Sequence, residues 1–588
     1  MRTPIYETMQ WLARSAAATL LTLGAACGSC DPPSVGPTVP ETEATAVHEV
    51  IDLFVFGRML GTISPCGCTT EPLGGLNYAF GYIENNSSAA TRLVLEPGSF
   101  LFPAPDGPEA PTDEAGWAQA KERAALLQKR FTALGDHLAS GVGPTDLSSP
   151  EGKAALKSWS LPRTLANVDS ATREGLGATS HRLVPAAGGT IGITTAIDPN
   201  APGAKTIPGL RPLKEGLAEE ISAMRKAGAD LVIVQLHAER PAVEALVREL
   251  PGIDIAIVDL IGSGDRSRLG TPAARIGDTW ILEPGEQAQT ITHLRLTIEH
   301  KPGQALPRPE LWTVVPPRAT IESELVRVEE RLKKFQSDPD ADPGFIQNLE
   351  AERQRLKSSL AKNAPAKGPA TAIFNQVKVT CKLQSDERAA SALEAYDAWV
   401  AEQNHARFAG VTPPEPAEGD PRYVGIDECE TCHDEAYEFW KTTRHAGAYK
   451  TLVDDNKQFD LSCVGCHVTG FRKPGGSEVV ENHDLQSVQC EQCHGPGSFH
   501  IDEPELEDKP NAIRREAPAE LCRECHTAEH SDTFEYNAYL RDILGPGHGE
   551  TSRIALGEGP TGHDLREAGF AKAGGACKKN KMGTKMPN

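Results

Sequence analysis

Residues 47–300 alternate short apolar runs with stretches of helical periodicity. Residues 50–56 are β-branched and aromatic, as in a buried strand, whereas apolar side chains in 117–134 recur every three or four positions. Further strand-like runs occupy 192–197, 231–236, 253–260 and 291–296, and further helical patterns occupy 217–226 and 242–250. Such alternation is typical of layered α/β folds. The pattern therefore predicts an α/β domain over residues 47–318.

A second pattern, purely helical, follows over residues 319–362. Its apolar positions are Ile321, Leu325, Val328, Leu332 and Phe335, then Phe345, Leu349, Leu356 and Leu360. The intervening residues 337–344 are rich in Asp and Pro, which end a helix. We predict an antiparallel helical hairpin that packs on itself, with a dimerisation element or an interdomain spacer as the alternative. Residues 363–420 are predicted to be a linker with one strand, 374–382, and one helix, 387–402.

The N-terminal 46 residues carry export signals. Residues 16–23 form a short apolar run, and Leu23-Gly-Ala-Ala-Cys27 places small residues before a cysteine. This predicts a signal peptide over 1–27. The run before Cys27 also resembles a bacterial lipobox, which implies lipidation of Cys27; ordinary cleavage near Ala26 is the alternative. Residues 28–46 are rich in Pro, Thr and Glu and are predicted to be a flexible tether.

The pattern Cys-x-x-Cys-His occurs four times between residues 429 and 526. Its cysteines are Cys429 and Cys432, Cys463 and Cys466, Cys490 and Cys493, and Cys522 and Cys525, and its histidines are His433, His467, His494 and His526. Two thiols at this spacing add to the two vinyl groups of one porphyrin, and the following histidine ligates the iron. Four repeats make structural zinc the poorer explanation. We predict four covalently bound haem c groups in a domain spanning 421–588.

Histidines are abundant in this domain. It contains ten of the 17 histidines, so six remain after the four proximal ligands are counted. Four irons need at most four distal ligands, and the supply therefore suffices for bis-histidine ligation at every haem. Saturated iron suits electron transfer, whereas an iron without a distal histidine is open to substrate.

The same region resembles the tetrahaem cytochrome c-554 family. The resemblance rests on Tyr423-Val-Gly425 before the first motif, Trp440 through His445-Ala446 after it, residues 488–500 around the third motif and residues 521–530 around the fourth. It implies a mainly helical, loop-rich domain with closely stacked haems. It also implies His445 and His500 as distal ligands, with His548 and then His530 as the next candidates.

Residues 47–300 resemble the metallophosphoesterase domain of the 5′-nucleotidase type. The resemblance rests on Pro65-Cys66-Gly67-Cys68 with Leu73-Gly-Gly-Leu76, on 133–147, on the strand ending at His237 and on 252–259. The family's metal ligands are replaced by Phe56-Gly-Arg-Met-Leu60, Glu96-Pro-Gly-Ser99, Pro144-Thr-Asp146 and Asp259-Leu-Ile-Gly262, and only His237 matches. A dinuclear centre needs a cluster of ligands. We therefore expect no hydrolysis, no second metal site, and a structural role for His237 at its strand end.

The remaining cysteines have open assignments. Cys66 and Cys68 fit a redox pair, a soft-metal site or partners in structural disulfides, and a disulfide between Cys66 and Cys68 themselves would be strained. Cys381 and Cys577 could form a long-range disulfide, which spacing alone does not establish. The tail from Gly575 onward is basic and is predicted to be disordered.

Taken together, the sequence predicts an exported electron-transfer protein. Its location would be the periplasm or the outer membrane of a Gram-negative bacterium, with a lipid on Cys27 as the anchor. Redox proteins, quinol-linked or other cytochromes, are the expected partners. The net charge of −22 argues against nucleic acid and could guide docking to a basic redox partner. The alternatives are an oxidoreductase acting on a small nitrogen or sulfur species at one open haem, and a metal-dependent phosphoesterase; the sequence leaves the oligomeric state open.

Overall fold

The computed structural model describes residues 47–65, 68–87, 91–105, 110–260, 269–300, 304–337, 342–361, 368–502, 513–527, 530–575 and 577. All of them belong to one compact unit, Ala46–Asn588. The predicted signal peptide with Cys27, the tether, Cys66 and the tail beyond Cys577 lie outside the described residues.

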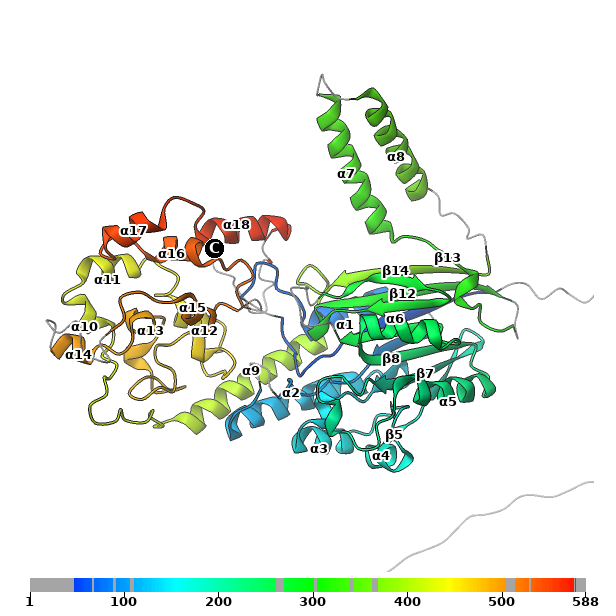
Figure 1. Cartoon of the computed structure of the whole chain (residues 1–588), viewed down its shortest axis with the longest axis horizontal. Helices are drawn as coiled ribbons and strands as arrows, with labels where there is room; N and C mark the ends of the chain where they lie inside the picture. The colour runs from blue at the N-terminus through cyan, green and yellow to red at the C-terminus, as the bar shows by residue number, and fades with distance from the viewer. Residues whose placement is uncertain are drawn as a thin grey trace, which may run out of the picture. The chain divides into compact units, whose positions relative to one another are not determined.

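Two β-sheets form the centre of the α/β region (Figure 1). The larger sheet has the order β13 (Trp312–Val314), β14 (Ala370–Lys378), β12 (Thr290–His300), β1 (Val47–Val55), β2 (Thr91–Glu96), β3 (Leu138–Gly141), β4 (Arg163–Thr164), β5 (Ala178–Thr179). The smaller sheet has the order β10 (Thr271–Ile276), β11 (Thr279–Glu283), β9 (Ile255–Leu260), β8 (Leu231–Glu239), β7 (Gly189–Ile197), β6 (Arg182–Ala186). Each sheet mixes parallel and antiparallel pairs.

The alternation of side chains along β1 shows how the layers stack. Ile51, Leu53 and Val55 join a buried cluster that also takes residues from β7, β8, β9 and β12, so this cluster fills the space between the two sheets. The intervening residue Phe54 points to the opposite face of the larger sheet. There it meets α1 (Leu76–Asn86), α2 (Glu114–Thr132) and α9 (Glu387–Phe408).

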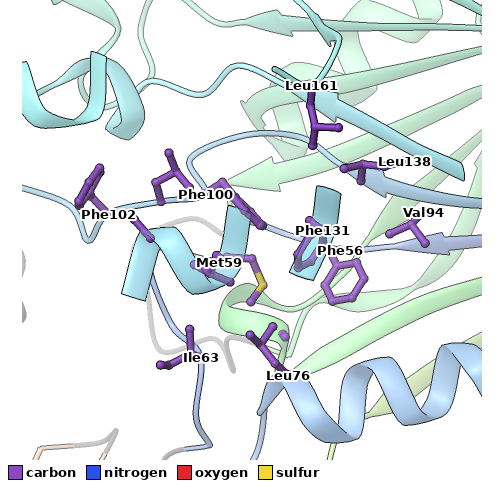
Figure 2. Close-up of a cluster of buried hydrophobic side chains, with 14 of the residues drawn as sticks. Phe56, Met59, Ile63, Leu76, Val94, Phe100, Phe102, Phe131, Leu138 and Leu161 are labelled. Atoms are coloured by element: carbon purple, nitrogen blue, oxygen red, sulfur yellow. The ribbon is translucent and has the colours of Figure 1, made fainter. Parts of the chain in front are cut away.

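Aromatic side chains are prominent in this second core. Figure 2 shows Phe56, Phe100 and Phe131 lying together, and the ring of Phe131 is 5.5 Å from that of Phe56 and 4.7 Å from that of Phe100 between centroids. A third cluster covers the outer face of the smaller sheet with α5 (Leu213–Lys226) and α6 (Arg240–Glu249). Two further helices, α3 (Pro150–Ser158) and α4 (Ser170–Gly175), connect strands of the larger sheet. The fold is thus a layered α/β/β/α arrangement, and the predicted fold class is confirmed.

The predicted linker needs a correction. The strand expected at 374–382 is β14, and it pairs with both β12 and β13 inside the larger sheet. The helix expected at 387–402 runs to Phe408 as α9 and packs on α1 and α2. Residues 370–408 therefore belong to the α/β domain, because strand pairing across the chain joins them to it.

The hairpin is present as predicted. Its helices are α7 (Arg318–Gln336) and α8 (Pro343–Ala361), which lie side by side in Figure 1. Ile321, Val328, Leu332, Leu349 and Leu356 form their own buried cluster between the two helices. The contact between the two helices therefore accounts for the apolar stripe without a further partner.

Residues 421–577 form short helices joined by long loops, as the cytochrome resemblance implies. The helices are α10 (Ile426–Glu430), α11 (Asp434–Trp440), α12 (Ala448–Asp454), α13 (Cys490–His494), α14 (Ser498–Asp502), α15 (Ala519–Arg523), α16 (Tyr536–Ile543), α17 (Glu550–Leu556) and α18 (Gly562–Lys572). Two isolated bridges, Val468–Gln486 and Phe471–Ser477, are the β-structure of its described part. A disulfide joins Cys381 to Cys577, with Cα atoms 5.9 Å apart, so that pairing is confirmed.

Candidate haem-attachment site

Each Cys-x-x-Cys-His motif lies on a single helical turn. In the first motif the amide of His433 donates to the carbonyl of Cys429 at 3.0 Å, and in the fourth the amide of His526 donates to the carbonyl of Cys522 at 2.8 Å. Residues three and four positions apart share one face of a turn. The two thiols and the histidine of each motif are therefore presented together, as attachment to one porphyrin requires.

Three of the four motif histidines have their Nδ1 atom held by the fold. Nδ1 of His467 lies 2.6 Å from the carbonyl oxygen of Ala448, and Nδ1 of His494 lies 2.8 Å from that of Arg514. Nδ1 of His526 lies 3.0 Å from the Ser531 hydroxyl. A carbonyl oxygen can only accept, so the Nδ1 atoms of His467 and His494 carry the proton. Their Nε2 atoms then keep a free lone pair for a metal.

Two motif histidines face a second imidazole. The rings of His433 and His500 have centroids 6.2 Å apart with planes 19° apart, and those of His526 and His445 are 6.2 Å apart with planes 45° apart. Two imidazoles on opposite sides of one metal, with metal–nitrogen bonds of about 2 Å, have centroids roughly 6 Å apart. Both pairs therefore fit an iron between them.

The other two motif histidines each have a neighbouring imidazole as well. The pKa of His467 is lowered by burial, partly offset by its bond to Ala448, and lowered further by His530. The pKa of His548 is lowered by burial and next by His494. His530 thus lies near the histidine of the second motif, and His548 lies near the histidines of both the third and the first motif. Burial also lowers the pKa of His445 to about 4, which keeps this ring neutral and able to ligate at physiological pH.

Contacts between cysteines show which motifs are neighbours. The thiols of Cys429 and Cys490 lie close enough to shift each other's pKa, and so do those of Cys466 and Cys525. Cys522 lies close enough to Cys493 to raise its pKa, after the larger effect of burial. The order in space is therefore first, third, fourth and second motif, which differs from the order in sequence.

The carboxylate of Glu491 organises the site in a way that the sequence did not reveal. It is buried inside the third motif and accepts backbone N–H bonds from Val424 at 2.9 Å, Gly425 at 2.9 Å and Gly497 at 2.8 Å. It thereby ties the third motif to the segment that leads into the first. A bond to the backbone has no sequence signature, so neither the bonds of Glu491 nor the carbonyls that accept from the proximal histidines could be predicted from the sequence.

His483 and His563 were not chosen as distal ligands, and both are exposed.

The strand ends of the α/β domain hold a different group of residues, all fully buried. Nε2 of His237 donates to the carbonyl of Pro97 at 2.7 Å, and its Nδ1 lies 2.5 Å from a carboxylate oxygen of Asp259. Glu96 accepts from the Gly98 amide at 2.6 Å and the Ser140 hydroxyl at 2.8 Å. The Nε2 atom of His237 is thus used in a bond to the protein itself, and its Nδ1 faces the Asp259 carboxylate without forming a hydrogen bond of normal geometry. Within the described residues, no three His, Cys, Asp or Glu side chains are arranged to hold a metal ion.

Comparisons with known proteins agree with the cytochrome resemblance. Residues 428–495 match the family model "Cytochrome c554 and c-prime". Cytochrome c-554 of Nitrosomonas europaea is 36% identical over 94 residues, a match that covers 13% of this chain and 40% of that protein. The chain therefore spans only two fifths of the curated relative's length. This region of the chain is thus similar to a multihaem cytochrome, as the motifs predicted.

Several solved structures similar to this chain are nucleotidases. A 5′-nucleotidase precursor from Thermus thermophilus has a TM-score of 0.40 and 14% identity, covering 73% of this chain and 71% of that one. The NAD nucleotidase of Haemophilus influenzae has a TM-score of 0.39 and 12% identity, and the match covers 74% of this chain and 73% of that one.

Among the described helices, none is long and apolar enough to cross a membrane.

Proposed function

We propose that this chain is an exported tetrahaem c-type cytochrome that transfers electrons through four bis-histidine haems. The observation that carries the proposal is that two motif histidines each face a second imidazole at a separation that fits an iron between the rings. His433 faces His500 and His526 faces His445 at 6.2 Å. For the other two motifs we propose His530 and His548 as the distal ligands, because His530 lies near His467 and His548 lies near His494.

The residues present fit haem c. The eight motif cysteines would form the thioethers, and His433, His467, His494 and His526 would be the proximal ligands. Haem c supplies a one-electron iron couple, and six-coordinate iron leaves no position for a substrate. The chain's own contribution is orientation. Bonds from Nδ1 to Ala448 and Arg514 hold two of the imidazoles in the tautomer whose Nε2 would be free to ligate iron.

For the α/β domain we propose a structural role without hydrolysis. A phosphoesterase would need the imidazole of His237 as a ligand, and that imidazole is engaged by Pro97 and Asp259. A two-metal mechanism requires several free ligands at the strand ends. Two of the buried carboxylates there, Glu96 and Asp146, accept instead from backbone amides and from the Ser140 hydroxyl.

The proposed location is the periplasm or the periplasmic face of the outer membrane. Covalent haem attachment and a disulfide, Cys381–Cys577, both fit an oxidising compartment. Lipidation of Cys27 would supply the anchor. Redox proteins, including quinol-linked or other cytochromes, are the proposed partners.

Optical and EPR spectra of the purified holoprotein test the proposal. We expect four haem c per chain by pyridine haemochrome assay, and low-spin ferric signals only. Cyanide and nitric oxide should leave the spectra unchanged. A persistent high-spin signal that nitric oxide or cyanide abolishes would contradict saturated ligation and favour an oxidoreductase acting at one open haem. Hydrolysis of p-nitrophenyl phosphate with added Mn²⁺ would contradict the structural role of the α/β domain.

A further inference from the structure

We infer that electrons enter and leave this protein at the first haem motif, through an acidic docking surface for a basic redox protein. The inference rests on the proposed electron-transfer function. Two independent observations support it: the α/β domain covers the opposite end of the row of motifs, and unneutralised carboxylates surround the first motif.

The order of the motifs makes the first and the second the two ends of a row. The first contacts the third through Cys429 and Cys490, and the second contacts the fourth through Cys466 and Cys525. The third and fourth are adjacent in the middle. An electron arriving from outside therefore reaches the row most directly at one of its ends.

The second-motif end is packed against the α/β domain. Val464, inside the second motif, is fully buried in a cluster with Ala115 of α2 and Phe408 of α9. Just before that motif, the Gln119 side chain donates to Asp460 at 2.6 Å. Lys457 forms an ion pair with Asp397 of α9 at 3.2 Å. These contacts leave little of that end for another protein.

Residues that follow the fourth motif also contact the α/β domain. The Thr70 hydroxyl donates to Asp532 at 2.6 Å, and Arg566 donates to the carbonyl of Cys68 at 3.1 Å. The disulfide of Cys381 with Cys577 holds the C-terminal segment to the α/β domain nearby. The covering surface is therefore fastened at several points.

The first-motif end is surrounded by exposed acidic side chains, which we call the acidic collar. The collar consists of Asp427, Glu428, Glu430, Asp434, Glu435 and Glu438, all of them exposed. No Lys or Arg occurs between residues 427 and 438. Glu438 pairs with Lys441, and the other five carboxylates form no ion pair with described residues. The collar therefore presents a concentrated negative charge.

The other motifs differ in charge. The acidic residue within the third motif, Glu491, is buried and bound to backbone amides. At the fourth motif, Glu520 is balanced by Arg523 at 3.6 Å. A negative field at one end of a redox row attracts a positively charged partner and raises its association rate. The same field repels anionic lipid and nucleic acid, so the collar suits a basic protein.

Charge reversal in the collar tests the inference. We would reduce the full-length holoprotein and follow electron transfer to a basic single-haem cytochrome c by stopped flow, from low to high ionic strength. E428K/E435K should lower the low-salt rate constant about tenfold and flatten its salt dependence, and the milder E428Q/E435Q should lower it about threefold. The matched control E520K/E524K reverses two exposed carboxylates at the fourth motif and should stay within about twofold of wild type.

The inference would be overturned if the collar variants and the control lowered the rate constant equally. It would also be overturned if neither collar variant changed the rate constant. An uncharged small-molecule mediator separates this failure from failure of the proposed function. If the mediator exchanges electrons normally with all variants, only the docking surface is wrong. If wild-type protein holds no haem or exchanges no electrons with the mediator, the proposed function and the inference both fall.

Discussion

At the scale of single residues, the motif histidines are oriented by hydrogen bonds from their Nδ1 atoms to the surrounding protein. Ala448 and Arg514 contribute carbonyls to the Nδ1 atoms of His467 and His494, and Ser531 contributes a hydroxyl to that of His526. The two carbonyl contacts select the tautomer of His467 and His494 whose Nε2 can ligate. The protein itself therefore positions these three proximal histidines, whether or not a distal ligand is present.

Removal of one distal histidine should open one haem. In H445A the fourth motif loses the imidazole that faces His526 at 6.2 Å. We expect one of four haems to become high-spin in the ferric EPR spectrum and to bind cyanide, while the other three stay low-spin. The matched control H483A changes an exposed histidine of the same region and should leave the spectrum as in wild type. Four low-spin haems in H445A would contradict the assignment.

The motif residues were predictable from sequence, whereas their pairing was not. The spacing Cys-x-x-Cys-His is local, so all eight cysteines and four proximal histidines could be named from the chain alone. Which distal histidine faces which motif depends on loops that bring distant residues together, such as His445 and His526. The spacing of these residues along the chain does not encode such a contact.

Glu96 should make the stability of the α/β domain depend on pH. Burial, and next the Asp146 carboxylate, raise the pKa of Glu96 from 4.5 to about 8. Between these values the unfolded chain releases this proton while the folded protein keeps it, so the free energy of unfolding falls as pH rises. E96Q mimics the protonated acid and should therefore be more stable than wild type at pH 8, by about 2–4 kcal/mol, with little difference near pH 4.5.

Urea unfolding followed by far-UV circular dichroism at pH 5, 6.5 and 8 measures this difference. The control is E84Q, which changes a carboxylate whose side chain is 41% exposed and should show no such trend. A constant difference between E96Q and wild type across the three pH values would disprove the raised pKa.

At the scale of elements, the hairpin and β14 show what periodicity can and cannot reveal. The stripe from Ile321 to Leu360 predicted α7 and α8 nearly to the residue, because both helices bury it against each other. β14 was placed in a linker because its partners, β12 and β13, come from earlier parts of the chain. Pairing of this kind is set by the whole sheet and has no local signature.

The hairpin should be dispensable for the rest of the fold. Replacing residues 319–361 by a short Gly/Ser linker removes a cluster that is complete within α7 and α8. We expect the deletion variant to keep the haem spectrum of wild type. The melting temperature of its α/β domain should stay within about 2 °C of wild type, which is less than the shift that a stability change of about 1 kcal/mol causes in a smaller domain. Light scattering should give the same number of chains per particle for both proteins. A lower number in the variant would show that the hairpin is a dimerisation element.

At the scale of the whole molecule, the α/β domain and the motif-bearing region are joined by polar contacts, an apolar cluster and one covalent bond. Gln119 with Asp460, and Lys457 with Asp397, join α2 and α9 to the segment before the second motif. The Cys381–Cys577 disulfide closes a sequence separation of 196 residues across the same halves. The α/β domain thus covers one end of the row of Cys-x-x-Cys-His motifs.

Breaking the disulfide should loosen that cover without removing any haem. Cross-linking residues so far apart restricts the unfolded chain, and its loss should lower the free energy of unfolding by about 3–5 kcal/mol. In C381S/C577S we therefore expect a lower melting temperature, four haems by pyridine haemochrome assay, and faster proteolysis after Lys572 and Lys382 under native conditions. The control N404A removes one hydrogen bond that crosses to the motif-bearing region, from Asn404 to the carbonyl of Phe459, and one within the α/β domain, from Asn404 to Gln119, and should lower stability by only about 1 kcal/mol. Loss of haem in the serine variant would mean that the disulfide is needed for maturation; unchanged stability would mean that the noncovalent contacts alone hold the cover in place.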